Sequence, residues 1–140
     1  MPATACRWSQ GSYALDGYRC DVGNLLFVLF DGLNPELFAD LAPQIRWDLE
    51  SFPQGTNVHL VWGEHGTYRI RNYERGVENF TLACGSGMYA SALTLLAGKP
   101  GQVIFVPDGR GQVCFRSDGR EIEMSGEAHW VATGVYRCCT

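Results

Sequence analysis

The sequence predicts an α+β fold, with a curled, mostly antiparallel sheet around one buried helix and a second helix outside it. Two observations lead to this prediction. Most of the 140 residues read as short strands separated by turns rich in Gly, Asn and Asp. Only two segments have a helical pattern, and one of them is apolar on nearly all sides, which is typical of a helix inside a domain.

Length and composition favour one globular domain, because 46% of the residues are hydrophobic and 19% are charged. The net charge is −4 and the arginines are scattered, so we expect no nucleic-acid partner. The first residues lack a basic end followed by an apolar block, so neither a signal peptide nor a membrane span is predicted. The cytoplasm is therefore the expected compartment.

The first predicted strands cover residues 18–22 and 25–30. A glycine and Asn24 interrupt them, which indicates a bulge or a close backbone approach and places Asn24 on a strand edge. We assign residues 1–17 to a leader or linker remnant and residues 18–140 to the domain.

A surface helix is predicted after Asn34, which has the character of an N-cap and is followed by Pro35 at the first helical position. Apolar residues at helical spacing follow, and Pro43 is expected to divide this helix into two pieces. Residues 57–63 and 67–76 then read as a hairpin of two strands.

The buried helix is predicted from the stretch MYASALTLLAG, which follows Gly87 and ends before Pro100. Residues 102–137 read as short strands separated by Asp-Gly turns at 108 and 118. This pattern predicts an antiparallel meander.

Cys84 is the first candidate for chemistry, because it stands where a strand-like run turns into the buried helix through Gly-Ser-Gly. A helix N-terminus has unpaired N–H groups and a partial positive charge, so it binds anions and is expected to lower the pKa of this thiol. Glycines at 85 and 87 permit a ligand carboxylate to approach the backbone. Glu74 can accept the thiol proton, and Arg75 can clamp a second carboxylate.

Each candidate also has a purely structural interpretation. Cys84 could be a buried free thiol, and Glu74 with Arg75 a solvated ion pair. Asn57 and Asn24 could be turn residues only. The three histidines and the other five of the six cysteines receive no role, and no zinc-ligand spacing is present.

The order ERGV, TLACGSG and an Ala-rich helix resembles the signature of the diaminopimelate epimerase family, which are cofactor-independent amino-acid epimerases. GNLLFVLF resembles that family's strand with GNPH, PQGTNVHLV its GTNV segment, and IEMSGEAHWVATGVYR its closing strands. The resemblance extends from about Tyr18 to Tyr136 and covers the family's second domain only.

The resemblance implies a barrel-like domain that faces a similar domain across a cleft, with one cysteine from each. One thiolate removes the α-proton of an amino acid and the other thiol returns a proton to the opposite face. Cys84 would be the acid/base of this domain and Glu74 its supporting carboxylate, while Gly85 and Ser86 would donate N–H groups to the α-carboxylate. The distal end of the substrate would be held by Asn24, Asn57 and Arg75.

No metal or pyridoxal phosphate is implied, and the expected ligand is a small-molecule amino acid in lysine and cell-wall precursor biosynthesis. Three departures from the family pattern are visible. The family's histidine is Leu26, and the stretch after ERGV is longer by one residue, at 78–80. The first domain and its cysteine are absent from this sequence.

A homodimer or a separate first-domain chain is therefore the expected partner. Two alternatives stay open at this point. The scaffold could racemise or epimerise another amino acid, or the chain could be a non-catalytic half-domain that binds an amino acid or a partner chain.

Overall fold

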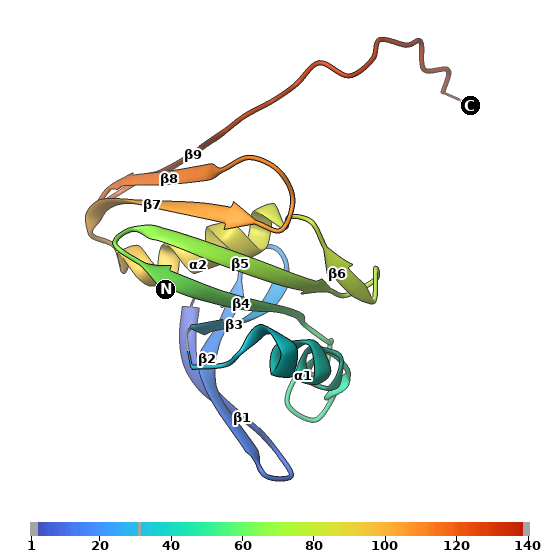
Figure 1. The fold of residues 1–140 in the computed structure, drawn as a ribbon, viewed down its shortest axis with the longest axis vertical. Helices are drawn as coiled ribbons and strands as arrows, with labels where there is room; N and C mark the ends of the chain where they lie inside the picture. Colours follow the sequence, from blue (N-terminus) through green and yellow to red (C-terminus); the bar gives the residue numbers. More distant parts are fainter. Residues whose placement is uncertain (1–2, 31, 139–140) are drawn as a thin grey trace.

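The computed structural model describes residues 3–30 and 32–138, and it has an α+β fold with one nine-stranded sheet and two helices (Figure 1). The elements in chain order are β1 (Ala3–Gln10), β2 (Tyr13–Asp21), β3 (Leu25–Phe30), α1 (Pro35–Trp47), β4 (Asn57–Glu64), β5 (Thr67–Glu74), β6 (Asn79–Thr81), α2 (Gly85–Leu96), β7 (Pro100–Pro107), β8 (Val113–Asp118) and β9 (Ile122–Gly126).

The sheet is open and mixed. Its strand order is β1-β2-β3-β4-β5-β7-β8-β9, with β6 paired to β5 beside this path. The β3–β4 and β5–β7 pairs are parallel and the others are antiparallel. The predicted barrel-like, curled sheet is wrong, because β1 and β9 lie at opposite ends of the strand order and far apart in Figure 1, so the sheet cannot close.

The two helices cover opposite faces of the sheet, and β3 lies between them. Leu26 and Val28 belong to the cluster that packs around α2, whereas Phe27 and Leu29 belong to the cluster under α1. Successive side chains of a strand point to opposite faces, so a strand that is buried on both faces reads as the unbroken apolar run LLFVLF.

Helix α1 begins where the sequence predicts it, whereas α2 begins at Gly85, three residues before the predicted stretch. Asn34 caps α1, since its Oδ1 accepts from the Leu37 N–H over 2.7 Å, and Pro35 is the first helical residue. The predicted break at Pro43 is wrong, because α1 passes through it without interruption. Buried side chains before and after the proline, such as Phe38 and Ile45, pack in one stripe that outweighs the lost backbone bond.

The β4–β5 hairpin and the β7–β8–β9 meander confirm the predicted strands and turns. Two segments differ from expectation. Residues 3–17 of the predicted leader form β1 and half of β2, with Trp8 buried in the α1 cluster, while residues 1 and 2 lie outside the described part. Within the described residues, positions 127–138 have no regular secondary structure and run away from the sheet after β9 (Figure 1).

Within residues 3–30 and 32–138, neither helix is both long and apolar enough to cross a membrane.

The Asn34 cap gives a direct test of why α1 begins where it does. Asn34→Ala removes the acceptor for the Leu37 N–H, and we expect the free energy of unfolding to fall by about 1 kcal/mol in urea denaturation. Asn34→Asp keeps an acceptor and serves as the matched control. Equal stability of Asn34→Ala and the wild-type protein would contradict this role of the cap.

Candidate functional site

The predicted site residues meet at one end of the sheet. Strand β4 begins at Asn57, and its antiparallel neighbour β5 ends at Glu74, so these two residues lie at the same edge. Helix α2 begins directly after Cys84. Leu26 pairs with Asn57 in the parallel β3–β4 ladder, so Asn24 lies at this edge as well.

Successive side chains of a strand point to opposite faces of the sheet, and this alternation places the polar side chains on the face that α2 covers. Val61 of β4 and Ile70 of β5 belong to the cluster around α2. Asn57 and His59 lie at even steps from Val61, and Asn72 and Glu74 at even steps from Ile70. These four polar side chains therefore form a column on the α2 face of the sheet, beside the helix N-terminus.

The Cys84 thiol is buried at this end of the sheet. We call the thiol, the first turn of α2 and the four polar side chains beside it the cysteine corner. Cys84 is the N-cap residue of α2, with 6% of its surface exposed, and its side chain makes no capping hydrogen bond. Its sulfur lies 3.4 Å from Ser86 Oγ. The predicted lowering of the thiol pKa is wrong: burial raises the pKa of Cys84, and the smaller opposing effects come from the Ser86 hydroxyl and the Gly87 N–H.

The Glu74 carboxylate faces the cysteine, although the following loop is long. Its negative charge also raises the pKa of Cys84, after burial. The Thr81 hydroxyl of β6 donates to Glu74 Oε1 over 2.5 Å and fixes the carboxylate. The extra residue therefore forms part of the turn into β6 and leaves Glu74 within electrostatic reach of the thiol.

Arg75 and Asn57 contact each other directly. The Arg75 N–H donates to Asn57 Oδ1 over 2.8 Å, and Arg75 Nη1 donates to the Gln54 carbonyl over 2.6 Å. The Asn57 amide nitrogen and the other N–H groups of the guanidinium have no such bond in the described part of the chain. Each of the two side chains is thus anchored through one atom, Asn57 Oδ1 or Arg75 Nη1, and its other N–H groups can donate to a ligand.

The remaining predicted residues lie at the same end of the sheet. Asn24 is exposed in the β2–β3 turn. Gly85 is exposed at the first position of α2, and Ser86 follows it half-buried. Their N–H groups belong to the first turn of the helix, where no intrahelical carbonyl is present to accept them. This geometry can receive a carboxylate.

Two residues of the corner, His59 and Asn72, were not predicted. His59 Nδ1 lies 2.9 Å from Asn72 Oδ1, and both residues are fully buried. Burial lowers the pKa of His59 to about 4, so its ring is neutral at physiological pH. The strand period was the available signal, because His59 lies two residues after Asn57 and Asn72 two residues before Glu74.

A glycine lets α2 lie directly on the His59 ring. A Cβ atom at Gly87 would be 2.5 Å from His59 Cε1, which is closer than real side chains approach. The helix and the buried histidine therefore fix each other's position. Because Cys84 precedes Gly87 by less than one helical turn, this contact also positions the thiol.

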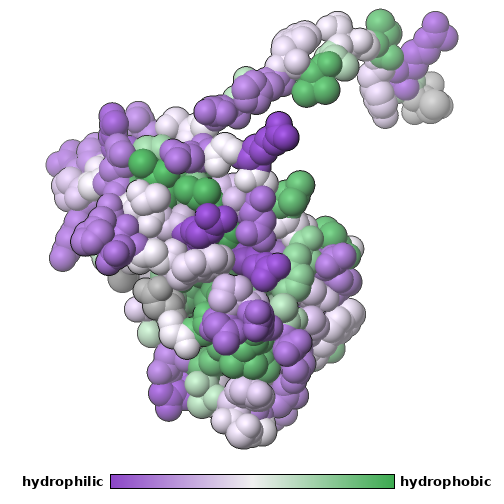
Figure 2. All heavy atoms as spheres, viewed as in Figure 1, coloured by the Kyte–Doolittle hydropathy of each residue, from purple (hydrophilic) through white to green (hydrophobic). Residues whose placement is uncertain are grey.

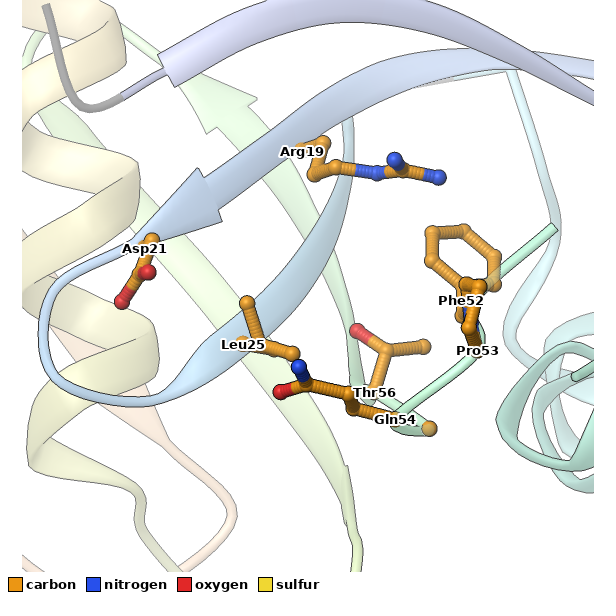
Figure 3. A pocket seen from close by; sticks show the side chains of 8 residues that line it. Arg19, Asp21, Leu25, Phe52, Pro53, Gln54 and Thr56 are labelled. Carbon is orange, nitrogen blue, oxygen red and sulfur yellow. The ribbon is translucent and has the colours of Figure 1, made fainter.

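A separate hollow of about 260 Å³ lies on the α1 face of the sheet (Figure 3). Arg19 and Asp21 of β2 point into it, opposite to Cys20, which packs in the α2 cluster. The loop from Phe52 to Thr56 forms its other wall. None of the predicted site residues lines this hollow.

The buried histidine predicts a pH dependence of stability. In the unfolded chain His59 binds a proton near its ordinary pKa of 6.5. In the folded state its pKa is about 4, so the ring stays neutral until the pH falls that far. Stability is therefore lost as the pH falls through this window, by about 3 kcal/mol from this group. His59→Gln should lose that much less than the wild type between neutral pH and pH ~4 in denaturant titrations.

The exposed His129 supplies the matched control, since its side chain is 82% exposed and His129→Gln should follow the wild-type curve. A change in the free energy of unfolding that His59→Gln causes equally at every pH cancels, because only the loss of stability between the two pH values is compared. If His59→Gln and the wild type lost the same stability on acidification, the buried neutral ring would be contradicted.

No protein-family model matches the chain. It is 38% identical to the diaminopimelate epimerase of Methanocella arvoryzae over 103 residues, which cover 71% of this chain and 37% of the relative. For the diaminopimelate epimerase of Archaeoglobus fulgidus the identity is 35% over 111 residues, covering 79% and 39%. For that of Acidothermus cellulolyticus it is 34% over 128 residues, covering 86% and 41%.

The chain thus spans less than half the length of the curated relatives that it matches, which is consistent with a single domain. The matches confirm the resemblance that the motifs around Cys84 indicated. Because 71–86% of the chain aligns with diaminopimelate epimerases from three organisms, the chain belongs to the diaminopimelate epimerase family.

Proposed function

We propose that this chain supplies one half of an amino-acid epimerase site, in which Cys84 is one of two acid/base thiols. The observation that carries the proposal is the Cys84 corner itself. A buried thiol stands at the start of α2, beside the Ser86 hydroxyl and opposite the Glu74 carboxylate. Family membership supports the same chemistry.

The raised pKa assigns Cys84 the part of the acid at neutral pH. A protonated thiol donates its proton to one face of the α-carbon while a base on the opposite face removes the original α-proton. Cys84 is left as a thiolate, the base is left protonated, and the configuration is inverted. In the reverse direction Cys84 is the base, and Glu74 then influences how readily the thiol loses its proton.

The surrounding donors are suited to hold an amino acid in place. The N–H groups of Gly85 and Ser86 would bind the α-carboxylate and stabilise the negative charge that develops on it. The distal end of the substrate would be held by three side chains: Asn24, Asn57 and Arg75. Of these, Arg75 offers the charge for a second carboxylate, because one guanidinium nitrogen is anchored on Gln54 and the others remain to bind.

The second base is expected to lie outside these 140 residues, in another copy of this chain or in a first domain. Apolar side chains beside the corner support this part of the proposal, because Val77 is 59% exposed and Leu82 is 72% exposed. The tail that leaves β9 carries further hydrophobic residues away from the body of the domain (Figure 2), including Trp130 and Val135. Such surfaces are typical of a protein that packs against a partner.

Diaminopimelate is the substrate that family membership favours, which would place the chain in lysine and cell-wall precursor biosynthesis in the cytoplasm. Another amino acid with a carboxylate at its distal end would satisfy the same donors. The stereochemical outcome follows from the arrangement of two groups on opposite faces, whichever amino acid is bound.

The proposal is tested in deuterated water with L,L- and meso-diaminopimelate. We expect the purified monomer to give no inversion, and inversion with deuterium uptake to appear on dimerisation or on addition of a first-domain chain. Cys84→Ser should reduce the rate of inversion by about 100-fold or more, because an essential acid is lost. Mass spectrometry follows deuterium, and chiral chromatography follows configuration.

Cys114→Ser is the matched control, since Cys114 lies on β8 and should leave the rate unchanged. Inversion that survives in Cys84→Ser would contradict the role of the thiol. If a complete assembly bound the amino acid without deuterium uptake, the chain would be a non-catalytic half-domain and the proposal would fail.

A further inference from the structure

The turn after Glu74 is tied to the helix on the opposite face of the sheet. Arg46, in the last turn of α1, donates to Glu78 Oε1 from Nε over 3.1 Å and from Nη2 over 2.8 Å. The Arg46 side chain is only 8% exposed, whereas that of Glu78 is 33% exposed. Removal of the Glu78 carboxylate would leave the buried Arg46 guanidinium without its partner, which is costly.

Glu78 also closes its own turn. Its Oε1 accepts from the Gly76 N–H over 3.0 Å, and its backbone N–H donates to the Glu74 carbonyl over 2.8 Å. These contacts to Gly76 and Arg46 hold the pKa of Glu78 below its usual value. The residue has a φ of 55°, a left-handed conformation that is unfavourable for glutamate. The carboxylate therefore keeps the turn in a conformation that the backbone alone would resist.

Two arginine side chains, Arg46 and Arg75, approach Gly55 near this carboxylate. A Cβ atom at Gly55 would lie 2.5 Å from Arg46 Nη1 and 3.3 Å from Arg75 Cδ. Both arginines contribute to the low pKa of Glu78, so its charge offsets their mutual repulsion. Glu78 thus affects where Arg75 lies, even though no direct hydrogen bond joins them.

We infer that Arg46 and Glu78 are positioning residues for the cysteine corner. By fixing the turn, they hold Glu74 against the thiol and present Arg75 to the ligand. The inference rests on the proposed function of Glu74 and Arg75, and it adds two residues outside the corner that set the geometry. One of them, Arg46, belongs to α1 on the opposite face of the sheet and acts through its contact with Glu78.

The test is the pH profile of Cys84 alkylation by iodoacetamide, followed by mass mapping in the intact chain. Glu78→Gln frees the turn and lets Glu74 move away from the thiol, so the midpoint of the profile should fall by about half a pH unit. The labelling rate at neutral pH should then rise about threefold. Glu78→Gly removes the same carboxylate and relieves the left-handed strain, which guards against loss of folding.

Arg46→Gln separates positioning from a simple field effect. If charges acted through space, removal of a negative group would lower the thiol midpoint and removal of a positive group would raise it. If the pair positions the turn, both variants release Glu74 and both midpoints fall. Opposite shifts for Glu78→Gln and Arg46→Gln would therefore overturn the inference.

Asp16→Asn is the matched control, because it makes the same charge change in an exposed pair with Arg7 on the far hairpin, and its profile should be that of the wild type. Lower thermal stability of the Glu78 variants with an unmoved profile would mean a structural pair only, and would also overturn the inference. The labelling uses no substrate, so its result is independent of whether the chain epimerises an amino acid.

Discussion

The contact of Gly87 with the His59 ring is the constraint on which the candidate site depends. Glycine is required because a Cβ atom would meet the ring at 2.5 Å, so α2 can lie this close to the His59 ring only with glycine at position 87. The close approach buries the thiol that precedes the helix, and burial dominates its pKa. Burial thus opposes the lowering of the thiol pKa that a helix N-terminus would cause, and the acid role proposed for Cys84 is consistent with it.

The column of polar side chains on the α2 face forms the candidate site where β4 begins and β5 ends. Strand alternation brings Asn57, His59, Asn72 and Glu74 to one side, and each is held by a neighbour rather than by solvent alone. Buried polar groups of this kind are costly unless paired, and His59 Nε2 and Asn72 Nδ2 have no partner among the described residues. The corner therefore accepts a loss of stability that an apolar core would avoid, as functional sites commonly do.

Local patterns predicted the elements, and tertiary packing determined what the patterns could not. The Asn34-Pro35 start of α1 and the glycine corner after Cys84 depend on neighbouring residues, so the sequence was sufficient. The continuity of α1 through Pro43 depends on burial against β4 and β5, which no local rule contains. For the same reason the helix N-terminus suggested a low thiol pKa, whereas desolvation raises it. The openness of the sheet depends on the order of distant strands.

The central claim is that the α-carbon of an amino acid lies beside Cys84, on the α2 face of the sheet. A crystal structure of the protein with bound meso-diaminopimelate tests this most directly. The account predicts the α-carboxylate on the N–H groups of Gly85 and Ser86, with the distal carboxylate toward Arg75. Ligand found only in the hollow between Arg19 and Phe52 on the opposite face, with the cysteine corner empty at saturating concentration, would contradict it.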